Sequence, residues 1–316
     1  MCGFTIGQGS DPDVEPVTDS LRSLEHRGPD DDGVRIDRSE GVVFAHCRLS
    51  IIDREGGEQP MYKNGLLLAF NGEIYNYREL RDTLRQEGHS FDTESDTEVL
   101  LEAYRRWGTE CLDRLRGMFS FVLWDEQKEQ LFLARDQFGQ KPLYFAETEN
   151  NFYASSEIQG LLPVEDITRV LDPSSLSLYL GLQYVPSPRT GFRDIQKLPP
   201  ASYAIVRAGE VVEQDSYWSL SYEEKTDRSF HEVQNQLREN LRESVRLRMR
   251  SDVPLGAFLS GGMDSSTVVA LMSELTDRPV KTVSIGFDHE RHDELEFARR
   301  VSERFGTDHH EFTVTP

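Results

Sequence analysis

The residues with the clearest chemical potential stand at the start of the chain, where Cys2 directly follows Met1. If Met1 is removed, Cys2 carries both a thiol and a free α-amine. The amine has an ordinary pKa of about 7.7–8.0, so it can accept the thiol proton near neutral pH and act as the base within the same residue. We therefore predict that Cys2 is a nucleophile that needs an oxyanion hole and a substrate grip, but no catalytic histidine.

Three further sites could supply those needs. Asn71 and Gly72 follow the apolar run 66–70, so we expect a side-chain amide and a backbone N–H to meet at a strand end and stabilise an oxyanion. Arg48 can clamp a carboxylate through two parallel hydrogen bonds, and Asp96, in the first turn of a helix, can accept an ammonium group. Taken singly, Arg48 could be a surface ion pair, Asp96 a helix-dipole residue and Asn71-Gly72 a hairpin turn. Together they would hold both ends of an α-amino acid.

A second motif lies near the end of the chain, where the segment 258–267 (FLSGGMDSST) runs from an expected strand into an expected helix. Two glycines let the backbone fold closely round a ligand, and the hydroxyls and free amides at a helix N-terminus attract phosphate. Asp264 in the same turn would repel phosphate unless a divalent cation lay between them, so the motif predicts Mg²⁺ as well as phosphate. The alternative is a tight turn with a serine cap. The loop resembles the PP-loop of the ATP pyrophosphatases, which implies a nucleotide site formed by Leu259, Ser260, Gly261, Gly262, Asp264, Ser265, Ser266 and Ile285.

The elements expected around these motifs change in character along the chain. Apolar runs of strand length at 4–6, 42–45, 66–70, 119–124, 131–134 and 143–145 occur with helices at 77–87 and from a Ser95–Glu98 capping box to Gly108, without regular βαβ alternation. A proline-rich region (185–200) and a hairpin then precede a charged stretch, 222–228, where we place the domain boundary. A helix capped by Ser229 follows, and strand 253–259, helix 265–275 and strand 280–287 form a βαβ unit, which implies a parallel sheet.

Composition narrows the class of protein. The 316 residues carry a net charge of −21, which argues against sequence-independent binding to nucleic acid or an anionic membrane. No run is long and apolar enough to span a bilayer, and no basic-then-apolar leader is present, so we expect a cytoplasmic protein. Only six residues are lysine, a composition that fits a halophilic source, although an acidic mesophilic protein is the simpler alternative. We expect Cys47 and Cys111 to be buried free thiols.

The motifs together closely resemble the class II glutamine amidotransferase domain, and their combination with the PP-loop resembles glutamine-hydrolysing asparagine synthetase. The matching stretches follow one another in family order over nearly the whole chain: 1–3, 26–30, 48–53, 71–76, 95–98, 116–119, 134–136, 141–144 and 259–266. The resemblance implies an α+β N-terminal-nucleophile sandwich of four layers (αββα) over residues 2–208. It implies an α/β parallel-sheet PP-loop nucleotide-binding domain over residues 225–316, there only in its N-terminal part.

The resemblance also implies roles for the site residues. Cys2 would attack the glutamine side-chain amide, with Asn71 and Gly72 holding the oxyanion, to give glutamate and ammonia. Arg48 and Asp96 would hold the amino-acid end, and the pocket would be completed by Leu49, Ser50, Ile51, Ile52 and Glu73. Ammonia would pass to the second domain, where ATP has converted aspartate to β-aspartyl-AMP. Asp264 would bind Mg²⁺.

The chain stops near the start of the second domain in family terms, so it looks like a truncated synthetase or one completed by another chain or by a homodimer. His309-His310 we assign to a surface loop rather than a metal site, because no third ligand follows at suitable spacing. Three functions stay open: asparagine synthesis, amidation of a different carboxylate by the same half-reactions, and a stand-alone glutaminase or partner subunit.

Overall fold

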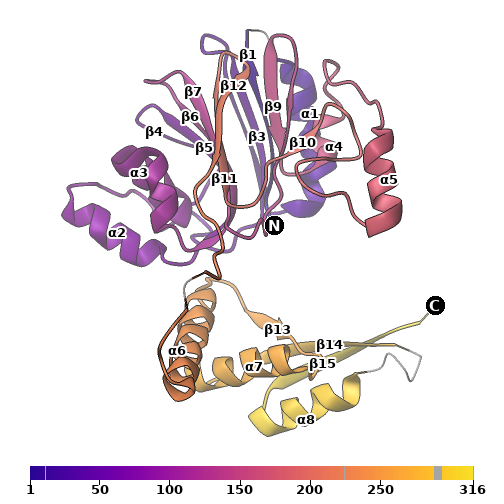
Figure 1. Ribbon diagram of the computed structural model, residues 1–316. Coiled ribbons are helices and arrows are strands. Elements are labelled where there is room, and N and C mark those ends of the chain that lie inside the picture. The colour runs from indigo at the N-terminus through magenta and orange to yellow at the C-terminus, as the bar shows by residue number, and fades with distance from the viewer. Residues whose placement is uncertain (11, 224, 288–293, 316) are drawn as a thin grey trace. The chain divides into compact units, whose positions relative to one another are not determined.

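The computed structural model describes residues 1–10, 12–223, 225–287 and 294–315 (Figure 1). Its contacts divide the chain into two compact units, Met1–Ser221 and Tyr222–Pro316. The predicted boundary stretch 222–228 begins where the second unit begins. The second predicted domain, 225–316, includes residues 288–293 and 316, which lie outside the described residues.

The first unit contains two six-stranded sheets, whose orders are β10-β8-β9-β1-β3-β2 and β12-β11-β7-β6-β5-β4. All the strand pairs recorded in these sheets are antiparallel. The strands are β1 (Gly3–Gly9), β2 (Asp31–Asp37), β3 (Val42–Arg48), β4 (Met61–Lys63), β5 (Leu66–Ile74), β6 (Gly117–Asp125), β7 (Gln130–Arg135), β8 (Tyr144–Glu147), β9 (Asn151–Ser155), β10 (Gln196–Lys197), β11 (Ser202–Arg207) and β12 (Glu210–Ser216). The helices are α1 (Val14–Leu24), η1 (Glu25–Arg27), α2 (Tyr77–Gln86), α3 (Asp96–Trp107), η2 (Gly108–Arg114), α4 (Ile158–Leu161) and α5 (Pro173–Leu182).

The alternation of side chains along each strand sorts the apolar residues into three layers of core. Phe4 and Phe44 of the first sheet pack against Ala69 and Val122 of the second, so the two sheets lie face to face. The opposite face of the first sheet packs under α1 and α4, where Val17 joins one buried cluster. Figure 1 shows these two helices on that side of the sandwich.

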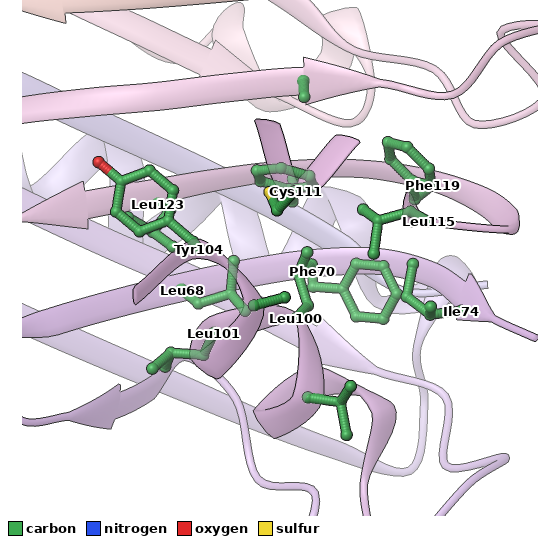
Figure 2. Packing of buried hydrophobic residues seen from close by; sticks show 14 of the residues in the cluster. Leu68, Phe70, Ile74, Leu100, Leu101, Tyr104, Cys111, Leu115, Phe119 and Leu123 are labelled. Atoms are coloured by element: carbon green, nitrogen blue, oxygen red, sulfur yellow. The ribbon is translucent and has the colours of Figure 1, made fainter. Parts of the chain in front are cut away.

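The outer face of the second sheet is covered by α2 and α3. Figure 2 shows Phe70 and Ile74 of β5 close to Phe119 of β6, and Leu100 of α3 belongs to the same buried cluster. Helices therefore cover both outer faces of a double sheet. The predicted four-layer αββα sandwich is confirmed.

Strand register explains how this fold brings the predicted site residues together. Gly3 pairs with Cys47, so the next position along the antiparallel ladder places Cys2 opposite Arg48. Cys2, Phe4, Phe44 and Arg48 lie at alternate positions and therefore share the face that meets the second sheet. The nucleophile and the arginine thus lie at one end of the layer between the sheets.

The second unit contains a three-stranded parallel sheet of order β13-β14-β15, which confirms the predicted βαβ unit. Ser229 and Glu232 form a reciprocal capping box at the start of α6, as the sequence predicts. The elements are α6 (Phe230–Arg248), β13 (Gly256–Phe258), α7 (Met263–Leu275), β14 (Lys281–Phe287), α8 (Leu295–Phe305) and β15 (Asp308–Val314).

Several local predictions are wrong. Asn71 and Gly72 do not lie beyond a strand end, because β5 continues to Ile74 and pairs with β6 throughout. The segment 253–259 forms a strand only at Gly256–Phe258. His309 and His310 lie in β15 rather than in a loop, since their backbones pair with Thr282 and Val283 of β14. In each case pairing with a neighbouring strand decides where the strand begins and ends, and the local sequence does not reveal that pairing.

The capping box predicted at Ser95 is half correct. The Ser95 hydroxyl accepts the backbone N–H of Glu98, but the Glu98 carboxylate instead accepts the N–H groups of Asp92 and Thr93 and binds Lys63. A cation at hydrogen-bond distance holds this carboxylate away from the helix terminus. None of the helices within the described ranges combines the length and apolar content that a bilayer crossing requires.

Candidate active site

A pocket of about 110 Å³ opens beside the thiol of Cys2. It gathers side chains from the start of β1, the end of β3 and the loop after it, the end of β5, and the first turn of α3. Of the predicted glutamine-site residues, all but Ser50 line it. The lining consists of Met1, Cys2, Arg48, Leu49, Ile51, Ile52, Gly57, Gln59, Phe70, Asn71, Gly72, Glu73, Asp96, Thr97, Met118 and Lys141.

Cys2 is held by one contact to its thiol and another to its backbone carbonyl. Its Sγ lies 3.4 Å from the backbone nitrogen of Leu49, which donates to it, and its carbonyl accepts a 2.9 Å hydrogen bond from Nε of Arg27. Burial raises the pKa of the thiol, while the Leu49 N–H and the terminal ammonium oppose this shift. A buried thiol with a raised pKa needs a nearby base before it can act as a nucleophile.

Asn71 is the residue best placed to stabilise an oxyanion. Its side chain is buried, and neither amide atom has a hydrogen-bond partner within the described ranges. A buried amide that lacks a partner costs folding free energy, so its free N–H groups are available to a bound ligand in the pocket. Gly72 is required by close packing, because a Cβ there would lie 2.2 Å from the carbonyl oxygen of Met118 in β6.

Arg48 lies in the pocket, but its guanidinium already donates hydrogen bonds to the protein backbone. Nη1 donates to the carbonyl of Arg54, and Nη2 donates to those of Ile52 and Asp53, at 3.1, 3.4 and 2.6 Å. The alternative of a surface ion pair is wrong, since the residue is only 5% exposed and bonds to carbonyls. Arg48 therefore fixes the loop that forms one wall of the pocket, and the guanidinium has further N–H groups for a substrate carboxylate.

Asp96 and Glu73 give the pocket its negative charge. The carboxylate of Asp96 accepts the backbone N–H of Ile74 at 2.9 Å, and burial raises its pKa to about 7, with Glu73 adding to the shift. The pKa of Glu73 is also raised, mainly by burial, while Lys141 acts in the opposite direction. An arriving ammonium group would relieve this unfavourable charge burial, so the site suits a cationic amine.

The structure also adds residues that the sequence did not assign to the site. Gln59, Met118 and Lys141 line the pocket although they lie in three separate segments. Lys141 belongs to a stretch that matched the family pattern, so a signal was present for it. Ser50 is the predicted residue that does not line the pocket, and its backbone N–H donates to the carboxylate of Asp30 at 2.8 Å.

A second pocket, of about 230 Å³, lies at the carboxyl ends of β13 and β14. Of the eight predicted nucleotide-site residues, Leu259, Ser260, Ser265 and Ile285 line it; Gly261, Gly262, Asp264 and Ser266 lie outside its lining. The rest of the lining comes from Phe258, Val283, Ser284, Glu294 and Leu295, which the sequence did not assign. Polar hydroxyls meet apolar side chains here, which suits a ligand that carries both phosphate and a flat apolar ring.

The loop between β13 and α7 is preformed by its serines. Ser260 and Ser265 hydroxyls lie 3.1 Å apart, and the Ser260 hydroxyl accepts the N–H of Gly262 at 3.3 Å. Gly261 has φ +78° and a Cβ there would lie 2.4 Å from Cβ of Phe297, so both backbone conformation and space require glycine. No side chain caps α7, so its first amides are open to an anion.

The donor set at this loop fits a magnesium ion that is also held by phosphate oxygens of a ligand. Asp264 is exposed in the first turn of α7, next to Ser265 in the sequence. Within the described ranges no three His, Cys, Asp or Glu side chains are grouped to hold a metal by themselves. Mg²⁺ in nucleotide sites is bound by one or two carboxylates together with phosphate oxygens, and a single aspartate meets that requirement.

Comparison with known proteins identifies the family. Residues 1–218 match the model of the glutamine amidotransferase domain. The chain belongs to the glutamine amidotransferase family. Residues 236–316 match the model of asparagine synthase. The pocket around Cys2 therefore lies in the amidotransferase domain, and the PP-loop lies in the asparagine synthase segment.

Individual relatives agree with these matches. The chain is 37% identical to asparagine synthetase [glutamine-hydrolyzing] 1 of Bacillus subtilis, covering 100% of this chain and 50% of that protein. It is 34% identical to an amidase of Gibberella zeae, covering 94% of this chain and 46% of that protein. The chain thus spans about half the length of these relatives.

A solved structure of the allosteric regulatory enzyme of purine biosynthesis matches with a TM-score of 0.52 at 17% identity. The match covers 99% of this chain and 80% of that one. At this identity the likeness supports the fold alone.

Proposed function

We propose that this amidotransferase chain carries out, or forms the N-terminal part of a protein that carries out, glutamine-dependent asparagine synthesis. Glutamine is hydrolysed at Cys2, ATP adenylates aspartate, and ammonia displaces AMP to give asparagine. The observation that carries the proposal is the single pocket that holds Cys2, the unpartnered amide of Asn71, Arg48 and the buried carboxyl of Asp96.

The first half-reaction begins when Met1 is removed and the amine of Cys2 takes the thiol proton. Sγ attacks the side-chain carbonyl carbon of glutamine, a C–S bond forms, and the carbonyl electron pair moves to the oxygen. Asn71 Nδ2 and the N–H of Gly72 hold that oxyanion. When the oxyanion collapses, the C–N bond breaks and the amine returns its proton to the nitrogen, which leaves as ammonia. Water then attacks the thioester in the same way and releases glutamate.

The other end of glutamine is recognised by charge. Its α-ammonium lies against Asp96 and Glu73, and its α-carboxylate accepts hydrogen bonds from Arg48. Both partners come from a rigid framework, since Arg48 is tied to three carbonyls and Asp96 to the N–H of Ile74. Such positioning places the substrate amide against the thiol without further loop ordering.

The second half-reaction uses the PP-loop segment. An aspartate side-chain oxygen attacks the α-phosphorus of ATP, the bond to the β-phosphate oxygen breaks, and pyrophosphate leaves. Ser260, Ser265 and the open amides of α7 bind the departing phosphates, and Leu259 and Ile285 contact the adenine nucleotide. Asp264 would hold Mg²⁺, which offsets phosphate charge when bound.

Purified full-length protein tests the proposal. With glutamine, ATP and Mg²⁺, we expect pyrophosphate release that depends on aspartate and yields asparagine. Glutamate formation without any ATP cleavage would contradict asparagine synthesis and support a stand-alone glutaminase or a partner subunit. Measuring molecular mass in solution in parallel shows whether a homodimer or a second chain completes the protein.

A second candidate is amidation of a different carboxylate by the same two steps. A relative of Gibberella zeae that matches 94% of this chain is named an amidase rather than a synthetase, so likeness over this segment does not fix the acceptor. The same assay decides between them. Pyrophosphate release with another carboxylic acid, but not with aspartate, would support this candidate.

A further inference from the structure

In the connection between β7 and β8, the loop 136–141 is built around a buried carboxylate. Asp136 is fully buried, and its oxygens accept the backbone N–H groups of Phe119, Phe138, Gln140 and Lys141 at 3.0–3.1 Å. Four charge-assisted hydrogen bonds to one side chain fix the course of the loop.

A buried arginine secures the same loop from the other side. The guanidinium of Arg135 donates to the carbonyls of Gly139, Lys141 and Leu198 at 2.6–2.7 Å. Lys141 therefore has its N–H bound to Asp136 and its carbonyl bound to Arg135. Two buried charged side chains thus hold the backbone of this one lysine.

The ammonium group of Lys141 has no such partner. The residue is 6% exposed and lines the pocket with Cys2 and Glu73, but across the described ranges Nζ forms no hydrogen bond or ion pair. Burial lowers the pKa of Lys141, and the charge of Glu73 opposes that shift. The fold fixes the backbone of Lys141 and provides no acceptor for its ammonium group. The positive charge of Lys141 is therefore available to interact with other groups in the pocket.

We propose that Lys141 is a positioning residue of the glutamine site, whose positive charge keeps the terminal amine of Cys2 unprotonated and ready to accept the thiol proton. This proposal rests on the proposed glutamine hydrolysis. Met1 and Cys2 both line the pocket, so removing Met1 leaves the new amine in the same pocket as Lys141.

The charges around the N-terminal amine include two cations that favour its neutral form. Burial lowers the pKa of the terminal amine of Met1; the Cys2 thiolate and Asp30 raise it, whereas Lys141 and Arg27 lower it. Because Cys2 lines the same pocket as Lys141, the positive charge of Lys141 acts in the same direction on the amine that Cys2 gains when Met1 is removed. The other charged groups that line the pocket come from β3, β5 and α3; they are Arg48, Glu73 and Asp96. Removing the charge of Lys141 should therefore raise the amine pKa and leave less free base near pH 7.

The test compares three variants of the full chain with the wild type: Lys141→Met, Lys141→Arg, and Lys197→Met as a control for the loss of a half-buried lysine outside the pocket. The rate of glutamine hydrolysis is measured as kcat/KM from pH 5.5 to 9.5. For Lys141→Met we expect the acid side of the profile to move upward by about one pH unit, with activity recovered at high pH. Lys141→Arg should keep the wild-type profile, as should Lys197→Met.

A second measurement does not depend on turnover. The pH dependence of iodoacetamide labelling at Cys2, followed by peptide mass, reports the thiolate, and its midpoint should also rise in Lys141→Met. If Lys141→Met does not fold, Lys141→Gln gives the same test with a polar side chain. A wild-type protein that does not hydrolyse glutamine would refute the proposed function, and the labelling midpoint would still decide the role of Lys141.

Two results would overturn the assignment. One is a Lys141→Met profile and labelling midpoint that coincide with those of the wild type. The other is a raised KM at every pH with an unshifted profile, which would make Lys141 a substrate ligand instead.

Discussion

At the scale of single residues, the proposed role of Asp96 and its burial favour opposite protonation states. As an ionised carboxylate it would bind the ammonium group of glutamine, but it is buried and its pKa is raised to about 7. Burial therefore makes the ionised form of Asp96 unfavourable, and the ammonium group of a bound substrate would relieve this cost. Two consequences can be measured.

The first consequence concerns affinity. Below about pH 7 Asp96 gains a proton and loses its attraction for ammonium, so the dissociation constant of glutamine should rise up to about tenfold between pH 8 and pH 6. Calorimetry on Cys2→Ala, which cannot turn over substrate, checks this, and buffers of different ionisation enthalpy should reveal proton release on binding. Affinity that stays constant with pH would exclude Asp96 as the ammonium ligand.

The second consequence concerns stability. Between pH 4 and 7 the folded protein binds the Asp96 proton more tightly than the unfolded chain does, so stability falls as the pH rises through this window. We expect Asp96→Asn to stabilise the protein above pH 7 by up to about 4 kcal/mol, and the difference to vanish near pH 4. Urea unfolding measures it, with the exposed Asp82→Asn as control. An Asp96→Asn variant less stable than the wild type at pH 8 would show that the carboxylate is not strained.

Residue chemistry predicted most of the glutamine site, because a terminal cysteine, an arginine, an asparagine and an aspartate have few combined uses. It did not assign roles to Lys141 or Met118, since their place in the pocket depends on how the loop 136–141 and strand β6 pack. It also included Ser50, which does not line the pocket.

At the scale of elements, the strand–loop–helix from β13 to α7 is the most self-contained part of the proposed mechanism. Its shape depends on Gly261 and on two serines, whereas Asp264 contributes no hydrogen bond to the loop among the described residues. A substitution at Asp264 should therefore change ligand binding without changing the shape of the loop.

That separation yields a prediction. Asp264→Ala should weaken MgATP binding by about tenfold or more through loss of the metal ligand, and it should leave glutamine hydrolysis unchanged. Calorimetric titration with MgATP measures the effect, with the exposed Asp277→Ala as the matched control. Equal nucleotide affinity in Asp264→Ala and the wild type would argue against a metal at this aspartate.

At the scale of elements, sequence patterns predicted some strands and not others. Runs of apolar residues predicted β1, β3, β5, β6 and β7. A strand that is buried on both faces needs apolar side chains at successive positions, and such a run is visible in the sequence. The polar strand β2 was not expected, and His309 and His310 of β15 were assigned to a loop, since the residues of both strands are mostly exposed and the strands form only by pairing with β3 and β14. Edge strands of this kind carry little signal of their own.

At the scale of the whole molecule, the dominant property is a net charge of −21 with only six lysines. At about 0.1 M salt, charges within roughly 10 Å repel one another, and at 1 M that range falls to about 3 Å. We predict that the melting temperature rises by several degrees between 0.1 and 2 M KCl. Calorimetry measures it, and a flat or falling melting temperature would contradict the halophilic adaptation that the composition suggests.

The proposal as a whole depends on one residue that provides both the nucleophile and its base. The most direct test measures glutamate formation by the wild type and by Cys2→Ala, together with synthesis supplied with free ammonia instead of glutamine. We predict that Cys2→Ala forms no glutamate from glutamine and retains ammonia-dependent synthesis at the wild-type rate. Glutamine hydrolysis by Cys2→Ala at the wild-type rate would contradict the account.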